Sequence, residues 1–327
     1  MIDNKKEVAG YLIFNRVRVQ DANAISSPIT YGFPAVSGFL GAFHAMSRKL
    51  QQHETLGYLS LGGVLIACHD CQVKAYRQTA YSDYTFNQTR NPIKKDGTTA
   101  SIIEEGKCGL VVTLVVEVLA DDAWDVEPEH TQALMNLSHQ WIQQQRLAGG
   151  SVLGLSSYEP VRYIVAESID EIKRHLLPAF VLIQAQDDLI GITHELQKNN
   201  PAATALDALI EVATLHHNPE QSNNGTTDWR TSSVKSGRGW LVPIPIGFQG
   251  ISACFEPGIM QHSRNPEYSS QYVEAIYSLG KWVFPYRLDD LKQAFWRYHH
   301  DSENNLYLTI QANQLSHIQQ SCKGEKV

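Results

Sequence analysis

The sequence predicts an α+β fold built on an antiparallel sheet. Two apolar runs at 62–73 and 109–120 are rich in β-branched residues, which fit a pleated, buried surface, so they indicate a pair of strands. Stretches with helical periodicity begin near residues 36 and 130, and a strand-like run precedes the first of them. The order strand, helix, strand, strand, helix is that of a ferredoxin-like fold.

The first strand is expected over residues 11–20 (YLIFNRVRVQ). Side chains alternate between the two faces of a strand, so Arg16, Arg18 and Gln20 share one face, which we interpret as the solvated one. The helix over residues 36–50 is amphipathic. Its core stripe comprises Phe39, Phe43, Met46 and Leu50, with Leu40 beside it.

A second amphipathic helix is expected within residues 130–150. Gly149 and Gly150 would end it, because glycine readily adopts the left-handed conformation that closes a helix. A further apolar run at 176–183 would complete the core. The core candidates of the second helix are Leu134, Leu137, Trp141 and Leu147.

The pattern changes beyond the core. Residues 192–217 have helical periodicity interrupted at Asn-Pro, which indicates an inserted helical hairpin, and residues 219–239 are turn-rich and predict a linker. The next run, 239–248, reads as a strand that Pro243 and Pro245 confine to a sheet edge. Closing helices are expected over 272–284 and 288–300.

Composition narrows the class of protein. The chain has 327 residues and a net charge of −7, which allows one large domain with an insertion or two domains. A nonspecific nucleic-acid binder would be basic, so any such binding must depend on local segregation of charge. Five irregularly spaced cysteines argue against a disulfide framework. The chain shows neither a secretory leader nor a run long enough for a bilayer, so we expect a cytoplasmic protein without a membrane partner.

A polar, basic tract with interleaved aromatic residues lies between the paired strands. It spans residues 74–108 and is predicted to project from the sheet as a β-hairpin thumb. Cations that follow a phosphate backbone and rings that stack on bases are how proteins hold single-stranded nucleic acid. The alternative is a solvated loop whose rings tuck back onto the sheet. The candidate groups are Lys74, Arg77, Arg90, Lys94 and Lys95, the rings Tyr76, Tyr81, Tyr84 and Phe86, and the polar residues Asn87, Gln88, Thr89 and Asn91.

The sequence lacks the motifs of metal, cofactor and covalent chemistry. Cys68 and Cys71 flank His-Asp, but a structural zinc site needs four ligands and no second ligand pair accompanies them. We found no P-loop, dinucleotide fingerprint or nucleophile elbow. We therefore expect no metal, no cofactor and no catalytic residue.

Four separated stretches resemble one family. They are residues 20–46, 86–107, 146–152 (RLAGGSV) and 239–252 (GWLVPIPIGFQGIS). They resemble the Cas-five-type subunit of the type I-F CRISPR surveillance (Csy, or Cascade) complex, the second protein of the Csy set. The resemblance runs from about residue 11 to 300. It implies a RAMP-superfamily member with a ferredoxin-like or RRM-like sheet, which binds the 5′ handle of CRISPR RNA in antiviral defence.

The resemblance implies partner subunits as well as RNA. Besides the thumb, the expected RNA-binding residues are Arg16, Arg18, Asn23, Ser26, Ser27, Arg146, Gly149, Gly150, Arg238 and Trp240. Glycines at 149 and 150 would let backbone N–H groups approach a phosphate, and the alternative there is a simple helix cap. The expected protein partners are the large subunit and an adjacent backbone subunit, with target DNA near the protospacer-adjacent motif as a further candidate.

We accordingly divide the chain into an RNA-binding core (1–183), a helical insertion with a linker (184–228) and a C-terminal region that completes the fold and docks partners (229–327). The apolar residues Trp282, Phe284, Phe295 and Trp296 are either part of that docking surface or ordinary core. Two alternatives to an RNA-binding scaffold are a metal-independent endoribonuclease that uses His44 as a base toward a 2′-hydroxyl, and a chain that only bridges protein subunits.

Overall fold

The computed structural model describes residues 6–121, 126–221, 227–263 and 265–312. It is an α+β structure with mostly antiparallel strands and few helices, which confirms the predicted class. The chain forms two compact units, each discontinuous in sequence: unit 1 contains 1–180 and 284–297, and unit 2 contains 181–283 and 298–327. The boundaries expected at 183 and 228 stay predictions.

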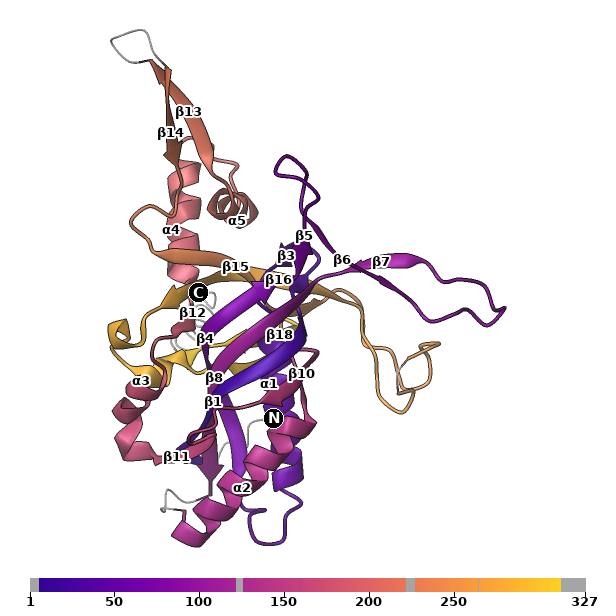
Figure 1. Cartoon of the computed structure of the whole chain (residues 1–327), viewed down its shortest axis with the longest axis vertical. Coiled ribbons are helices and arrows are strands. Elements are labelled where there is room, and N and C mark those ends of the chain that lie inside the picture. Colours follow the sequence, from indigo (N-terminus) through magenta and orange to yellow (C-terminus); the bar gives the residue numbers. More distant parts are fainter. Residues whose placement is uncertain (1–5, 122–125, 222–226, 264, 313–327) are drawn as a thin grey trace. The chain divides into compact units, whose positions relative to one another are not determined.

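Three long antiparallel strands form the centre of unit 1, side by side in Figure 1. In spatial order they are β4 (Ser60–Val73), β8 (Lys107–Ala120) and β1 (Glu7–Asn23), followed by β10 (Gly150–Gly154) and β9 (Arg146–Leu147), while β11 (Val161–Val165) also pairs with β1. The two runs predicted to pair do so in β4 and β8, with Leu65 opposite Val115. The first strand is confirmed, and its Arg16 and Arg18 are exposed.

Two helices belong to this sheet. Helix α1 (Val36–Leu50) has the predicted bounds, and its predicted core stripe is buried, with the Phe43 ring 5.1 Å from that of Phe14 on β1. Helix α2 (Pro128–Gln144) ends before the glycines that were expected to stop it. The prediction of a glycine cap is wrong, because Gln145 is already extended and Arg146 pairs with Ser151, so Gly149 and Gly150 belong to the turn between β9 and β10.

Shorter elements complete unit 1. They are β2 (Ile25–Ser27), β3 (Thr30–Tyr31), β5 (Ala75–Tyr76), β6 (Thr85–Arg90), β7 (Ile102–Glu105), the 3-10 helices η1 (Ala166–Glu171), η2 (Pro285–Arg287) and η3 (Leu291–Ala294), and α3 (Ile172–His175). The returning segment brings Phe295 and Trp296 fully into the core, and Trp296 forms a bridge with Val64. The core alternative therefore holds for these two residues.

A buried ion pair lies beside this returning segment. Glu117 on β8 is 3% exposed, and its carboxylate accepts hydrogen bonds from the Arg297 guanidinium, with Nε–Oε2 at 3.1 Å, and from the Gly63 N–H at 2.8 Å. Burial raises the pKa of the nearby Tyr11 to about 12, and the negative charge of Glu117 is the second cause of this increase. The carboxylate is thus held by several donors, as a buried charge requires.

Unit 2 contains a run of antiparallel strands and a helical pair. Across the sheet the order is β12 (Phe180–Gln184), β16 (Val273–Val283), β15 (Trp240–Gly250), β18 (Leu306–Ile310) and β17 (Arg297–Asp301). Helices α4 (Gln186–Gln197) and α5 (Ala205–Ala213) pack on it around Leu189, Ile192 and Leu241. The helical hairpin broken at Asn-Pro is confirmed, and Thr204 with Asp207 forms a capping box that starts α5.

Three predictions about this half of the chain are wrong. The supposed linker contains a hairpin of β13 (His216–Gln221) and β14 (Thr227–Ser232), whose described residues are all exposed. Residues 272–284 form β16 rather than a helix, since aromatic and β-branched residues around Gly280 favour an extended chain. Residues 288–300 hold only η3 and most of β17. The run at 176–183 does join the core as predicted, since Leu176, Val181 and Leu182 are buried, and it enters β12, which pairs with β16.

The edge position of the two prolines is consistent with the pairing of β15. Pro243 and Pro245 pair with β16, whereas the described pairing of β15 with β18 begins only at Gly247. None of the helices in the described part of the chain has the length and apolar character that crossing a bilayer requires.

Candidate nucleic-acid interface

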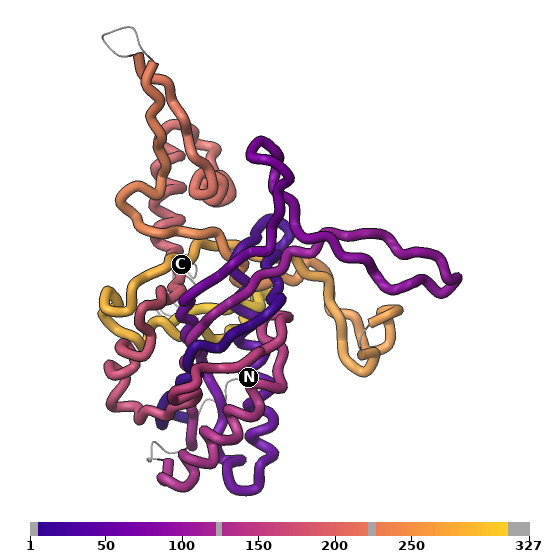
Figure 2. The backbone as a smooth tube through the Cα atoms, viewed as in Figure 1, coloured from indigo at the N-terminus to yellow at the C-terminus, as the bar shows by residue number. Residues whose placement is uncertain are grey.

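Residues 74–105, between β4 and β8, form a three-stranded ribbon of β5, β6 and β7, which we call the β5–β7 extension. It contains two hairpins, β5 with β6 and β6 with β7, whose loops diverge in Figure 2. Only Ala100 of the extension is buried. The polar tract is therefore surface, and its side chains can meet a ligand.

The cations of the extension differ in their surroundings. Arg77 lies 4.9 Å over the Tyr84 ring and donates to the Ala80 carbonyl at 3.3 Å. Arg90, Lys94 and Lys95 are exposed, and among the described residues their side chains form no ion pair. These last three are available to an anionic ligand.

The rings of the extension are also divided. Phe86 is half-buried and meets Tyr31 of β3 edge-on, with ring centroids 5.6 Å apart. Tyr76, Tyr81 and Tyr84 are exposed. Phe86 thus fits the alternative in which a ring packs back onto the protein, whereas the three tyrosines are accessible to a ligand. The polar candidates Asn87, Gln88, Thr89 and Asn91 are exposed along β6 and just after it.

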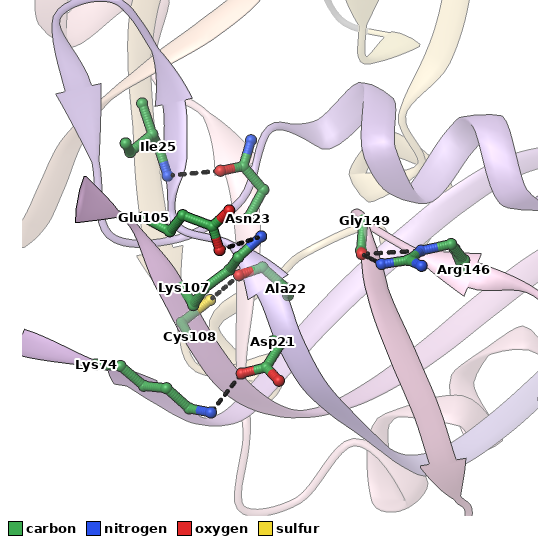
Figure 3. A network of polar contacts seen from close by, with 10 residues as sticks. All are labelled: Asp21, Ala22, Asn23, Ile25, Lys74, Glu105, Lys107, Cys108, Arg146 and Gly149. Carbon is green, nitrogen blue, oxygen red and sulfur yellow. Dashed lines mark hydrogen bonds and ion pairs between the residues drawn. The ribbon is translucent and has the colours of Figure 1, made fainter. Parts of the chain in front are cut away.

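Polar contacts surround the base of the extension near the end of β1, and one of them, an ion pair, joins the two (Figure 3). Lys74 pairs with Asp21, and Lys107 pairs with Glu105 at 3.5 Å. The Asn23 side chain accepts from the Ile25 N–H at 3.1 Å. The side chains of Lys74 and Asn23 are therefore already engaged.

The loop that contains Gly149 lies against the same end of β1. Ala148 and Gly149 adopt positive φ angles of 48° and 80°, and the Ala148 carbonyl accepts from the Asn23 N–H at 2.9 Å. The Arg146 guanidinium donates twice to the Gly149 carbonyl, at 3.1 and 2.6 Å (Figure 3). A Cβ on Gly38 of α1 would come within 2.9 Å of Ala148 Cα, so glycine there permits the close approach.

The remaining unit 1 candidates make local contacts. The Ser26 and Ser27 hydroxyls lie 2.7 and 2.6 Å from that of Thr30, inside the β2–β3 turn. Arg16 has a positive φ of 49°, its N–H donates to Thr113 Oγ1 at 3.2 Å and its Nη2 donates to the Leu177 carbonyl at 3.4 Å. Arg18 is exposed on the same strand.

Two candidates lie in unit 2. Arg238 donates to Glu195 Oε1 at 2.5 Å and to the Val234 carbonyl at 2.7 Å. Trp240 is exposed, and its ring is tilted 6.3 Å from that of Trp282. Arg238 therefore contributes to the packing of unit 2 whatever else it binds.

Sequence reasoning missed His69, which lies between Cys68 and Cys71. Its Nε2 is 2.8 Å from Thr113 Oγ1, and its buried Nδ1 finds no partner in the described part of the chain. Burial, helped by Arg16, lowers the pKa of His69 to about 4. The signal available in the sequence was a histidine in an otherwise apolar strand. No group of three His, Cys, Asp or Glu among the described residues is placed to hold a metal ion.

The sequence matches a known family over almost this whole structure. Residues 12–309 match the family described as CRISPR-associated protein (Cas_Csy2). The chain is 31% identical over 314 residues to the CRISPR-associated protein Csy2 of Pseudomonas aeruginosa (strain UCBPP-PA14), which covers 90% of this chain and 93% of that protein. The chain therefore belongs to the Csy2 family of CRISPR-associated proteins. This confirms the resemblance to the second protein of the Csy set.

Proposed function

We propose that this chain is a non-catalytic RNA-binding subunit of a type I-F CRISPR surveillance complex, and that it holds the 5′ handle of the CRISPR RNA. The β5–β7 extension carries the proposal. Among the described residues it presents Arg90, Lys94 and Lys95 without ion pairs on its β6–β7 hairpin, exposed amides along β6, and exposed tyrosines on its β5–β6 hairpin. Phosphates, bases and base edges of a single strand are bound by these three kinds of group.

Local charge segregation reconciles this role with an acidic chain. The net charge is −7, so the protein as a whole repels a polyanion at long range. The extension carries Lys74, Arg77, Arg90, Lys94 and Lys95 against Asp83, Asp96, Glu104 and Glu105, so it is slightly basic within an acidic chain. Carboxylates much farther away than the Debye length, about 8 Å at physiological salt, are screened from it. Binding would therefore be confined to this surface and to added positive surface from a partner.

The topology of unit 1 supports a ferredoxin-like, RRM-like core of the RAMP and Cas-five type. The strand before α1 is β1, the next two are β4 and β8, and β10 follows α2. Their spatial order is β4, β8, β1, β10, with every described pairing antiparallel. In this interpretation β10 takes the place of the fourth ferredoxin-like strand, and the extension is the thumb.

The same proposal covers the partners. The large subunit and a backbone subunit would supply surface for the rest of the handle, and target DNA beside the protospacer-adjacent motif is a further candidate ligand. Base pairing by the guide, rather than this chain, would read the target. The compartment would be the cytoplasm, where CRISPR RNA is made.

Binding and cleavage of repeat RNA, scored together, test the function. Full-length protein, alone and co-expressed with the large subunit, is incubated with end-labelled single-stranded repeat RNA and followed by gel shift and by denaturing gel. We expect wild-type protein to retain the RNA without cutting it. A variant in which Arg90, Lys94 and Lys95 are replaced by Ala should retain the RNA poorly. Wild-type protein that retains no RNA under either condition would contradict the proposal and favour a chain that bridges protein subunits only.

The endoribonuclease alternative has one observation in its favour. His44 is exposed on α1 rather than packed in the core, so a substrate could reach it. RNA cut by wild-type protein and left intact by His44→Ala would establish that alternative. The matched control is His194→Ala on α4, which is also an exposed helical histidine, because a general effect of losing such a residue would appear in both variants.

A further inference from the structure

A second aromatic surface lies in unit 2, across β15, β18 and β17. Phe248 and Tyr307 are directly opposite each other on neighbouring antiparallel strands and are 46% and 42% exposed. His300 on β17 stacks on Tyr307, with ring centroids 4.5 Å apart and planes 13° from parallel. Three accessible rings therefore lie on three neighbouring strands of one sheet.

A β-bulge brings Phe248 to this face. Pro245 is opposite Tyr277 but Gly247 is opposite Ile276, so one extra residue interrupts the alternation of β15. Without the bulge, Phe248 would share the face of the buried Ile244. A Cβ on Gly247 would collide with the Tyr307 carbonyl, so the backbone approach that makes the bulge needs glycine.

The rings border a pocket of about 400 Å³. Phe248, Val273 and Tyr307 form its strand side, and Ser269, Ser270 and Gln271 from the connection between β15 and β16 form much of the other. Among the described residues, none that lines it carries a charge. The Gln271 side chain is oriented by its own contacts, since its Nε2 donates to the Ser252 carbonyl at 2.6 Å and its Oε1 accepts from the Tyr307 hydroxyl at 3.4 Å.

We propose that this pocket binds one unpaired nucleobase of the RNA, stacked on the Phe248 and Tyr307 rings. Uncharged walls suit a neutral flat ring and offer nothing to a phosphate, while hydroxyl and carboxamide groups at the rim can bond to base edges. Stacking on aromatic side chains is the sequence-tolerant part of single-strand recognition. The inference rests on the proposed function, because it assigns a second contact to the same RNA.

Leucine substitutions separate stacking from simple burial of apolar surface. Tyr307→Leu and Phe248→Leu remove a ring and keep an apolar side chain, whereas Tyr307→Phe keeps the ring. Tyr268→Leu is the matched control, since Tyr268 is exposed in the same connection and does not line the pocket. The probe is fluorescein-labelled single-stranded repeat RNA, and a parallel series carries one abasic site at each position in turn.

We expect each leucine variant at 248 and 307 to bind the intact RNA about 5- to 150-fold more weakly, the range that stacking of one base implies. Tyr307→Phe should lose far less affinity than Tyr307→Leu because it keeps the ring, and Tyr268→Leu should bind like wild type. One abasic site should weaken wild-type binding and leave Tyr307→Leu no weaker than before, which identifies the stacked nucleotide. Melting temperatures measured in parallel check that the variants fold.

Three outcomes overturn the inference and differ from one another. If wild type binds RNA and both leucine variants bind it equally well, the pocket does not bind a base, and the proposed function still stands. Unchanged RNA affinity with loss of a co-expressed protein subunit makes the surface a protein interface. Absence of RNA binding by wild type removes both the inference and the proposed function.

Discussion

Unit 1 uses charged side chains in two opposite ways. At Glu117 a carboxylate lies in the core and is satisfied by Arg297 and the Gly63 N–H. At the β5–β7 extension, Arg90, Lys94 and Lys95 are exposed and form no ion pair with any described residue. The first arrangement can only serve the fold, because its charge is neutralised within the chain. The second contributes little to folding and leaves its charge for a ligand.

Substitutions at the buried pair should therefore affect stability, and substitutions at the extension should affect binding. Removing one partner of a buried pair leaves an uncompensated charge in the core. Removing an exposed cation leaves a solvated surface almost as stable as before. The two regions should therefore respond to different measurements.

The largest expected effect is at the buried pair. Arg297→Met should reduce the free energy of unfolding by about 3–5 kcal/mol, because Glu117 would then be buried without its cation. Urea denaturation followed by circular dichroism measures it. The double variant Glu117→Gln with Arg297→Met should recover part of the loss. A loss below about 1 kcal/mol would show that water reaches the carboxylate.

At the extension the expected change is in binding. Affinity falls with salt, and each phosphate neutralised on a single strand contributes about −0.7 to the slope of log affinity against log salt. Replacing Arg90, Lys94 and Lys95 by Ala should therefore make this slope less negative by about 2. Fluorescence anisotropy between low and physiological salt measures the slope, and urea denaturation should give wild-type stability. An unchanged slope would show that the extension does not touch phosphates.

Phe86 stands between the two behaviours because it is half-buried against Tyr31. Phe86→Ala should weaken RNA binding by about 1–3 kcal/mol if the ring also meets a base. It should cost the fold only the aromatic pair, about 0.5–1.5 kcal/mol beyond its buried area. Tyr31→Ala is the control, since it removes the same ring pair and keeps Phe86. Equal loss of RNA affinity in both variants would assign the effect to the ring pair.

The smallest effect is expected at His69, because its side chain is partly exposed and solvent weakens the contribution of its shifted pKa to stability. Its pKa is about 4 in the folded chain against an ordinary value near 6.5. Between these values the unfolded chain binds more protons, so stability should fall as the pH is lowered from about 6.5 toward 4. His69→Gln should flatten this part of the profile in urea midpoints.

Most of the correct predictions for unit 1 came from local sequence patterns. Branched and aromatic runs identified β1, β4 and β8, and the stripe from Phe39 to Leu50 identified α1 with its bounds. The 74–108 tract was identified as surface because its composition excludes a core. Patterns failed where one residue type fits two structures. Gly149 and Gly150 suit a helix cap and a strand turn equally, and β16 contains side chains that also fit an amphipathic helix.

The class of fold, the position of the polar extension and the family follow from the amino-acid sequence, since each depends on composition and order along the chain. Which candidate side chains already have partners could be learned only from the three-dimensional packing. Lys74, Asp21 and Arg238 are remote in sequence from their partners, and pairing between distant segments leaves no local pattern. The same reason hid the Phe248 and Tyr307 pair. A bulge and a strand register, both set by packing, place those two rings opposite each other.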